Sequence, residues 1–402
     1  MILKSSLKQV IALQKANLDQ KDTGLKRDLL KVIPTLASHA LILSGVRRCG
    51  KSTLLFQLLY AKYKFALYLN FEDTRLYEFE VADFTRLDSI ISDDKTKVLF
   101  FDEIQIIEGW ERYIRQKLDE GFRVVVTGSN ASLLSKELGT KLTGRHITKE
   151  LFPFSYQEFC SYKKLTLSEK SLSRYLNEGG FPAYIKTNEE DILINLLDDI
   201  IIRDIAIRYG VRDVKTLQRL ALYLLTNTAK LITGNKLKSI FEVGATSTVM
   251  EYLSHLEYSY LFFYVPKFSY SLKKQLVNPR KVYAIDTGLV HINSASFTED
   301  SGRKFENLIY LHLRRTYKEI YYFLEKGECD FIVFENKKIH KIIQVCYTLN
   351  QDNMKRELNG IFEALAYFKL KTGTIITLNQ TDSFEQNGMV AQVIPAYDFL
   401  VR

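Results

Sequence analysis

The chain has 402 residues, of which 46% are hydrophobic and 26% charged, with only 6 prolines. This balance is typical of a folded protein of two or three domains and excludes a disordered or fibrous chain. The 56 Lys and Arg residues exceed the 47 Asp and Glu residues, and the net charge of +9 permits nucleic-acid binding without establishing it.

The sequence has no sign of secretion or of membrane insertion. Its four cysteines are scattered without metal-ligand spacing and are too few for a disulfide scaffold. No opening stretch has the order of a signal peptide, and no apolar run approaches the ~18 residues that span a bilayer. We therefore expect a cytoplasmic protein with reduced thiols and no membrane partner.

A phosphate-binding loop is predicted near the start of the chain. Residues 1–32 are expected to be mainly helical and to lead into an apolar strand at 40–43, after which residues 45–53 read Gly-Val-Arg-Arg-Cys-Gly-Lys-Ser-Thr. Such a loop exposes backbone N–H groups at the N-terminus of a new helix, where anions bind. Lys51 can reach the β- and γ-phosphates, and Ser52 can offer its hydroxyl to Mg²⁺. The residues predicted to contact the nucleotide here are Gly45, Arg48, Gly50, Lys51, Ser52 and Thr53.

The second half of the predicted site is the apolar run 97–101, which ends in Asp102 and Glu103. Ligands of parallel sheets bind outside the carboxyl ends of the strands, so both acids should lie beside the phosphates. We expect Asp102 to hold Mg²⁺ and Glu103 to polarise the attacking water. Together the two motifs predict binding of ATP or GTP with Mg²⁺, followed by hydrolysis.

Polar residues also end the two strands on either side of this run in the chain. Glu72 and Asp73 follow the strand before it, and they could support the site or simply form a turn. The strand predicted at 123–128 is followed by Ser129 and Asn130, which could sense the γ-phosphate. A Gly-Ser-Asn turn without a ligand is the alternative.

Arg145 is the candidate for an arginine finger. It follows a helix predicted at 132–142 and precedes a short strand predicted at 146–151. An arginine at this point can project into the nucleotide site of a neighbouring subunit and stabilise transition-state charge. The alternative is a basic residue that only complements a helix C-terminus. A finger in trans would make the protein a homo-oligomer.

The pattern becomes mostly helical from about residue 151 to about 228, which is typical of a lid after a nucleotide-binding core. Helices at 215–226, 234–241 and 246–256, followed by strands at 260–265 and 281–286, predict a winged helix-turn-helix. Its third helix could enter a DNA major groove while basic residues touch phosphates. That helix lacks Arg and Lys, so DNA and protein remain alternative partners. The basic residues concerned are Lys273, Lys274 and Arg280.

The last hundred residues carry a second set of polar positions. Glu306 on a predicted helix and Asp330 on a predicted strand are placed as in a Mg²⁺-dependent phosphodiesterase. The next strand, however, has Gln344 and Cys346 where an acid and a lysine would be needed. Glutamine is a poor Mg²⁺ ligand, and cysteine cannot replace an ammonium that stabilises the reacting groups. This site is therefore expected to be degenerate.

The motifs, taken in order, resemble the AAA-type ATPases of bacteria and archaea whose C-terminal half carries a domain of unknown function related to PD-(D/E)xK nucleases. The resemblance implies an α/β fold with a P-loop NTPase core at 1–154, a helical lid plus winged helix at 155–295 and a restriction-endonuclease-like domain at 296–402. It also favours ATP over GTP. The motifs are GVRRCGKS at 45–52, FDE at 101–103, TGSN at 127–130, GR at 144–145, LFPFS at 151–155, GGFP at 179–182, KVYAIDTG at 281–288, and Glu306 with Asp330.

The function expected from these features is Mg²⁺-dependent ATP hydrolysis coupled to rearrangement of the C-terminal half, with DNA as one candidate substrate. Two alternatives remain open at this point. One is a nucleotide-gated regulatory or scaffold protein that binds another protein with little turnover. The other is an ATP-gated, metal-dependent nuclease, which the degenerate site makes the weaker expectation.

Overall fold

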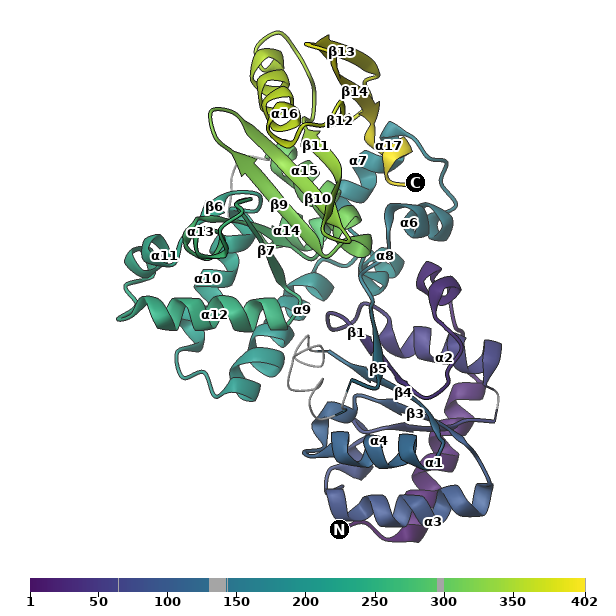
Figure 1. Cartoon of the computed structure of the whole chain (residues 1–402). Helices are drawn as coiled ribbons and strands as arrows, with labels where there is room; N and C mark the ends of the chain where they lie inside the picture. Colours follow the sequence, from purple (N-terminus) through teal and green to yellow (C-terminus); the bar gives the residue numbers. More distant parts are fainter. Residues whose placement is uncertain (64, 130–141, 143, 295–299, 402) are drawn as a thin grey trace. The chain divides into compact units, whose positions relative to one another are not determined.

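A computed structural model describes residues 1–63, 65–129, 142, 144–294 and 300–401 of the chain. The chain forms two compact units, Met1–Phe152 and Pro153–Arg402, which are coloured purple to blue and teal to yellow in Figure 1. We describe each unit by itself.

The first unit is built on a parallel five-stranded sheet with the strand order β2-β3-β4-β1-β5. Strands β1 to β4 are short, mainly apolar runs that are buried on both faces, as expected for a parallel sheet covered by helices, whereas the edge strand β5 is polar and only partly buried. The parallel register aligns their carboxyl ends, because Ser44 pairs with Gly128 and Asn70 pairs with Asp102. The strands are β1 (Ala40–Ser44), β2 (Leu67–Asn70), β3 (Val98–Asp102), β4 (Arg123–Gly128) and β5 (His146–Glu150).

Helices cover this sheet, with α1 against β2, α2 against β3 and α4 against β4. The core between them is rich in aromatic rings, and Phe84 stacks on Tyr113 with ring centroids 3.9 Å apart. Burial of each such ring stabilises the fold by roughly 1.5–3 kcal/mol. The helical segments are α1 (Lys4–Asp19), η1 (Asp28–Val32), α2 (Lys51–Lys62), η2 (Thr74–Leu76), η3 (Val81–Asp83), α3 (Phe84–Asp94), η4 (Ile104–Ile106) and α4 (Trp110–Asp119).

The second unit begins with short helices, as the sequence predicts. Ser155 and Ser168 each accept a hydrogen bond from a backbone N–H in the first turn of the helix that follows, and Pro182 opens another helix. The last segment of this series is a π-helix, which no sequence pattern predicts. The helices are α6 (Tyr156–Lys163), α7 (Glu169–Glu178), α8 (Pro182–Thr187), α9 (Asp191–Asp199) and η6 (Ile200–Ile207).

Next comes a group of three helices and a small antiparallel sheet with the strand order β6-β8-β7. The sequence predicts only two of these strands, because β6 contributes two residues and leaves no periodic signal. A short helix, α13 (Leu272–Val277), lies between β7 and β8 in the chain. The other elements are α10 (Val214–Thr226), β6 (Leu231–Ile232), α11 (Gly234–Phe241), α12 (Thr246–Tyr258), β7 (Phe262–Pro266) and β8 (Arg280–Ala284).

The rest of the second unit is a six-stranded mixed sheet with the order β13-β14-β12-β11-β10-β9. It joins the small sheet directly, because Lys267 bridges to Tyr322 and the Phe268 N–H donates to the Tyr322 carbonyl at 2.7 Å. Asn307 on α15 also pairs with the backbone of Ala284 at the end of β8. The elements are α14 (Thr287–Asn293), α15 (Ser301–Thr316), β9 (Glu319–Leu324), β10 (Glu328–Glu335), β11 (Lys338–Val345), α16 (Met354–Phe368), β12 (Thr372–Thr377), β13 (Asp382–Gln386), β14 (Met389–Pro395) and α17 (Ala396–Phe399).

A buried junction ties the early helices of this unit to the segment after β8. The carboxylate of Asp286 accepts hydrogen bonds from the Gly180 N–H at 2.6 Å and the Leu289 N–H at 2.9 Å. A Cβ atom on Gly180 would lie 2.3 Å from the carbonyl oxygen of Phe154, so the backbones pack too closely for any other residue. The Gly-Gly-Phe-Pro and Asp-Thr-Gly motifs therefore form one contact.

Candidate nucleotide-binding site

The phosphate loop connects the end of β1 with the start of α2 (Figure 1). Two of its glycines are required by geometry. Gly50 has a φ of 101°, and a Cβ atom on Gly45 would lie 2.1 Å from the carbonyl oxygen of Leu151. The loop thus presents bare backbone at the N-terminus of a twelve-residue helix, an arrangement that fits a phosphate group.

Lys51 is 5% exposed, and its ammonium group lies inside this loop. It donates to the carbonyl oxygens of Gly45 and Val46, both at 3.1 Å. The same nitrogen lies 3.8 Å from a carboxylate oxygen of Glu103. Arg48 on the loop is exposed and has a left-handed backbone with φ 60°. The predicted lysine and glutamate are therefore brought together.

The loop is also held from behind by Arg27, a buried residue in the segment before β1. Its guanidinium donates to the Cys49 carbonyl at 2.8 Å and to the Phe152 carbonyl at 2.7 Å. The Leu151 N–H donates to the Ser44 carbonyl at 2.7 Å. The last residues of the first unit are thus hydrogen-bonded to both ends of the phosphate loop.

Asp102 is 1% exposed and is surrounded by hydroxyl groups. Tyr68 donates to it at 3.0 Å, and Thr127 and Ser52 also donate to it. Burial, together with the neighbouring Glu103, raises the pKa of Asp102, while these hydrogen bonds oppose the rise. A serine hydroxyl beside a carboxylate is a donor set that fits Mg²⁺, so Ser52 and Asp102 would hold that ion.

Glu103 follows β3 in a left-handed conformation, with φ 53°. For a residue other than glycine, this left-handed conformation costs roughly 1–3 kcal/mol, so contacts with the surrounding structure must hold it in place. Here the Glu103 N–H donates to the Thr127 hydroxyl at 3.0 Å, and the Glu103 carboxylate accepts from the amide of Gln105. Thr127 therefore contacts both acidic residues. In the sequence, Thr127 is one hydroxyl residue inside an apolar strand. That signal places it only behind the candidate sensor residues Ser129 and Asn130.

The two acids after β2 have different surroundings. Glu72 lies 3.5 Å from the guanidinium of Arg47 on the phosphate loop, and burial and Glu103 raise the pKa of Glu72. Asp73 instead bonds with Arg75 and Gln14, and the hydrogen bond from Arg75 holds the pKa of Asp73 well below its usual range. Glu72 thus belongs to the surroundings of the loop, and Asp73 caps a turn.

The sensor candidates can be placed only in part. Ser129 is buried and follows β4 directly, at the same sheet edge as the phosphate loop. Asn130 lies outside the described residues, as does most of the helix predicted at 132–142. Thr53, another predicted nucleotide contact, is half-buried in the first turn of α2.

Arg145 lies at the opposite edge of the sheet from the phosphate loop. It directly precedes β5, whose first residue, His146, pairs with Ala40 at the start of β1. The loop follows the other end of β1, about 13 Å away along the strand. Arg145 forms an ion pair with Asp119 at 2.6 Å. Within one first unit, this geometry keeps Arg145 away from Lys51.

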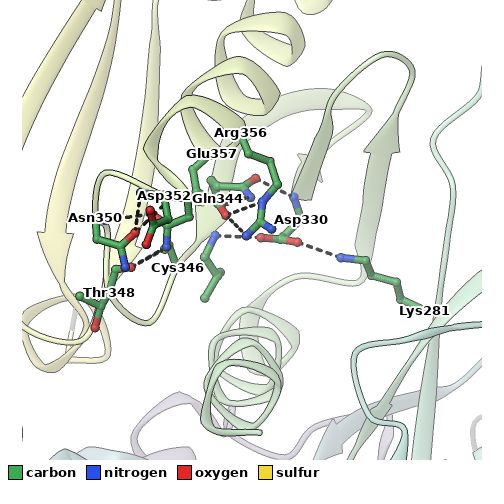
Figure 2. A network of polar contacts seen from close by, with 11 residues as sticks. Lys281, Asp330, Gln344, Cys346, Thr348, Asn350, Asp352, Arg356 and Glu357 are labelled. Atoms are coloured by element: carbon green, nitrogen blue, oxygen red, sulfur yellow. Dashed lines mark hydrogen bonds and ion pairs between the residues drawn. The ribbon is translucent and has the colours of Figure 1, made fainter.

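The positions of the predicted nuclease-like site lie in the second unit (Figure 2). Glu306 on α15 and Asp330 on β10 come together, as expected, but they meet at the ammonium of Lys281 from β8, 3.0 and 2.8 Å away. Gln344 accepts from the Asp330 N–H at 3.2 Å. Cys346 donates to the Thr348 carbonyl at 3.2 Å. Sequence reasoning misses Lys281 because it lies 49 positions before Asp330.

Three observations concern the described part of the chain as a whole. None of its helices is long and apolar enough to cross a membrane. Within the same residues, no group of three or more His, Cys, Asp or Glu side chains is arranged to hold a metal ion. All four cysteines are free and buried.

Comparison with known proteins places these features in a family. A family profile described as an AAA domain matches residues 37–160, and one described as a domain of unknown function (DUF8612) matches residues 169–300. An uncharacterized protein of Methanocaldococcus jannaschii, MJ1544, is 35% identical over 416 residues, which cover 96% of this chain and 92% of the relative. An uncharacterized protein of Haemophilus influenzae is 31% identical over 371 residues, which cover 86% and 91%.

Solved structures resemble the chain more weakly. The replication initiator DnaA bound to AMPPCP and single-stranded DNA has a TM-score of 0.31 and 16% identity, covering 57% of this chain and 85% of that one. The RuvB Holliday junction branch migration motor of Thermotoga maritima has a TM-score of 0.29 and 14% identity, covering 66% and 90%. The family relationship therefore rests on the profiles and on the relatives. The resemblance inferred from the motifs is confirmed: the chain belongs to the family of these uncharacterized archaeal and bacterial proteins, which here combines an N-terminal AAA domain with a C-terminal domain of unknown function.

Proposed function

We propose that the protein is a Mg²⁺-dependent ATPase in which nucleotide binding and hydrolysis in the first unit drive rearrangement of the second. The observation that carries this proposal is the meeting of Lys51, Ser52, Asp102 and Glu103 at one sheet edge. Thr127 supports it further, because its hydroxyl fixes both acids.

Each residue has a distinct role in this proposal. Lys51, already inside the loop, exchanges its two carbonyl partners for phosphate oxygens. Ser52 and Asp102 hold Mg²⁺, which neutralises charge on the phosphates when bound. Glu103 lies next to the ammonium and orients the attacking water, the positioning role that phosphoryl transfer needs.

The test is steady-state ATP hydrolysis by wild type and by Glu103→Gln, with Glu108→Gln as the matched control because Glu108 is exposed on the next turn. Glu103→Gln should lower kcat by at least about 100-fold while ATP binding persists. Glu108→Gln should behave as wild type. Equal turnover in all three proteins, or no nucleotide binding in any of them, would refute the proposal.

DNA is the partner that the second unit is proposed to act on. The elements α10, β6, α11, α12, β7 and β8 follow one another in the order of a winged helix, and the strand order β6-β8-β7 supports that assignment. Lys273 and Lys274 are exposed between β7 and β8 and could contact phosphates. Binding of duplex or single-stranded DNA should then weaken steeply as salt rises.

A protein partner is the competing proposal, and the sequence of α12 favours it. The helix runs Thr246–Tyr258 and carries no Lys or Arg that could contact DNA phosphates. On this alternative the protein is a nucleotide-gated scaffold with little turnover. Slow hydrolysis that is indifferent to DNA, with intact ATP binding, would favour the scaffold. Hydrolysis that DNA stimulates would favour the motor.

A further inference from the structure

Lys281 is a deeply buried charged group of the second unit that the proposed ATPase does not use. Its side chain is 4% exposed, although it carries a charge that is costly to bury. Three carboxylate oxygens lie around its ammonium nitrogen: Asp330 at 2.8 Å, Glu306 at 3.0 Å and Glu328 at 2.7 Å. Figure 2 shows Lys281, which comes from β8 of the small sheet, pointing at Asp330 on β10 of the large sheet.

The number of partners matches the chemistry of the group. An ammonium has three N–H donors and no acceptor, and three carboxylate oxygens stand within 3.0 Å of it. Burial disfavours the charged form of Lys281, but Asp330 and Glu306 outweigh that cost and raise its pKa well above the ordinary value. The lysine is therefore a cation held by carboxylates on several sides.

The carboxylates are held in place by other groups as well. Tyr283 donates its hydroxyl to Glu306 at 2.6 Å, and the Val345 N–H donates to the second oxygen of Asp330 at 2.9 Å. Figure 2 also shows the adjoining network, in which Gln344 donates to Glu357 and the guanidinium of Arg356 bonds to the same carboxylate. The acids of α15 and β10 are thus held in place around the ammonium of Lys281.

We propose that Lys281 is the resident cation of this cluster and occupies the position that a divalent metal ion would otherwise take between Glu306 and Asp330. Hard divalent cations prefer carboxylate oxygens, and their affinity for a site rises with the number of carboxylates. An immobile ammonium at the centre excludes them. This cluster therefore binds no divalent cation, and removal of the lysine charge creates a metal site.

A catalytic lysine is the competing interpretation of the same residue. Such a lysine would need a metal ion bound by Glu306 and Asp330 at the same time, with the ammonium turned toward substrate. Lys281 is instead directed at these two carboxylates themselves, at hydrogen-bond distance from both. That geometry favours a lysine that replaces the metal over a lysine that assists it.

The test is Mn²⁺ binding to the full chain without nucleotide. Calorimetry and electron paramagnetic resonance would each measure how many Mn²⁺ ions are bound. Lys281→Met should bind one more Mn²⁺ ion than wild type, and Lys281→Met/Asp330→Asn should lose it again. Lys267→Met is the matched control, because Lys267 follows β7, the strand beside β8, and its ammonium pairs with Glu325 at 3.2 Å and not with the carboxylates around Lys281. It should bind no extra ion. Comparison of the single and double variants also removes any contribution from the nucleotide site.

Lys281→Met could fail to fold, since it leaves three carboxylates without their cation. Lys281→Met/Glu306→Gln serves as the second variant. Compared with Lys281→Met it has one unpaired negative charge fewer, and it keeps the carboxylates of Asp330 and Glu328. Either protein should gain thermal stability from Mn²⁺, whereas the midpoint of wild type should not move.

Two results would overturn the proposal. The first is a wild-type protein that takes up Mn²⁺ and loses it in Asp330→Asn, or that cleaves DNA with Mn²⁺ only when Asp330 is intact. The second is a folded Lys281→Met, or a folded Lys281→Met/Glu306→Gln, that binds no more Mn²⁺ than wild type. Neither result depends on ATP hydrolysis, so this proposal and the ATPase proposal fail separately.

Discussion

The hydroxyl of Thr127 joins the two acidic residues of the nucleotide site, since it donates to Asp102 and accepts from the Glu103 N–H. We predict that Thr127→Val lowers kcat for ATP by at least about 10-fold, because Glu103 loses the contact that holds its strained backbone. The affinity for ATP should change little, since Lys51 and the loop are intact. Steady-state kinetics and equilibrium binding would measure both quantities.

Thr127→Ser is the control for that variant, because it keeps the hydroxyl and removes only a methyl group. Its kcat should stay close to wild type. A Thr127→Val protein with unchanged kcat would show that Glu103 is held by other contacts, and an equal loss in the serine variant would point to packing.

Asp286 gives a prediction about pH. Burial raises the pKa of Asp286 to about 6, while hydrogen bonds from backbone N–H groups oppose the rise. The folded state therefore keeps a proton that the unfolded state loses near pH 4. Stability from this group is complete below about pH 4 and is lost as the pH rises through about 6, a change of up to about 3 kcal/mol.

Chemical unfolding between pH 4 and pH 7 would measure this change. Asp286→Asn cannot titrate, and its single amide oxygen can accept from only one of the N–H groups of Gly180 and Leu289, which bond to different oxygens of Asp286. The variant should therefore be less stable at every pH, but its free energy of unfolding should fall less over that interval. If wild type and the variant have the same pH dependence, Asp286 does not carry the effect.

The positions of candidate site residues could be predicted from sequence where neighbours in the chain fix the geometry, whereas their roles stay predictions. Lys51 and Ser52 follow a strand within one short loop, and Asp102 and Glu103 end another strand. The sequence placed Thr127 only behind the sensor candidates and assigned no role to Arg27, because their partners lie more than twenty positions away in the chain. Lys281 is the extreme example. Nothing in the sequence around it indicates that its ammonium lies against Asp330, 49 positions later in the chain.

At the scale of elements, the contact between the two glycine-containing motifs offers a steric test. We predict that Gly180→Ala destabilises the second unit by more than about 2 kcal/mol, because the new methyl group would meet backbone atoms of Phe154 that cannot move away. Gly244→Ala is the control, since nothing lies within 4 Å of a Cβ atom there. Thermal unfolding of both variants would give the difference.

A Gly180→Ala protein with an unchanged midpoint would mean that the Phe154 backbone shifts at little cost. Because the chain has two units, the midpoint compared should be that of the transition which Gly180→Ala alters, with the other transition as an internal reference.

Long apolar or amphipathic segments were predicted correctly, within a few residues, as elements. The strand predicted at 97–101 is β3, and the helix predicted at 234–241 is α11. Elements without their own periodicity were missed. The two-residue strand β6 forms only because β8 lies beside it, and η6 departs from α-helical bonding in a run rich in isoleucine.

At the scale of the whole molecule, the proposed arginine-finger role of Arg145 would connect catalysis with assembly. Its place at the far edge of the sheet means that it can serve a nucleotide only in another copy of the chain. We predict that Arg145→Ala and Glu103→Gln are each nearly inactive, and that a mixture of the two regains measurable ATP turnover. In the mixture, some sites combine an intact Glu103 with an intact Arg145 from a neighbour.

The control for this mixture is each variant alone at the same total concentration. Turnover by wild type should also rise more than linearly with protein concentration. If the mixture stays inactive, or if Arg145→Ala turns over ATP as wild type does, the ion pair with Asp119 is the whole role of this arginine.

The division of the chain at this scale could be predicted only in outline. The family resemblance predicts an AAA domain followed by a domain of unknown function, and both are present. The three-part division at residues 154 and 295 stays a prediction. Sequence gives no access to contacts such as Lys267 with Tyr322, which join the small sheet of the second unit to the large one.

The hydrogen bonds of Leu151 and Phe152 have a mechanical consequence. These residues are the only covalent route from the first unit to the second, and they bond to Ser44 and to Arg27, which itself holds Cys49 in the phosphate loop. Tension on this tether must strain the same bonds that shape the loop. The two effects are linked by thermodynamic reciprocity. If displacement of the tether changes the nucleotide affinity by some factor, bound nucleotide changes the equilibrium constant for that displacement by the same factor. Mechanical load on the tether and nucleotide occupancy of the loop would then report on each other.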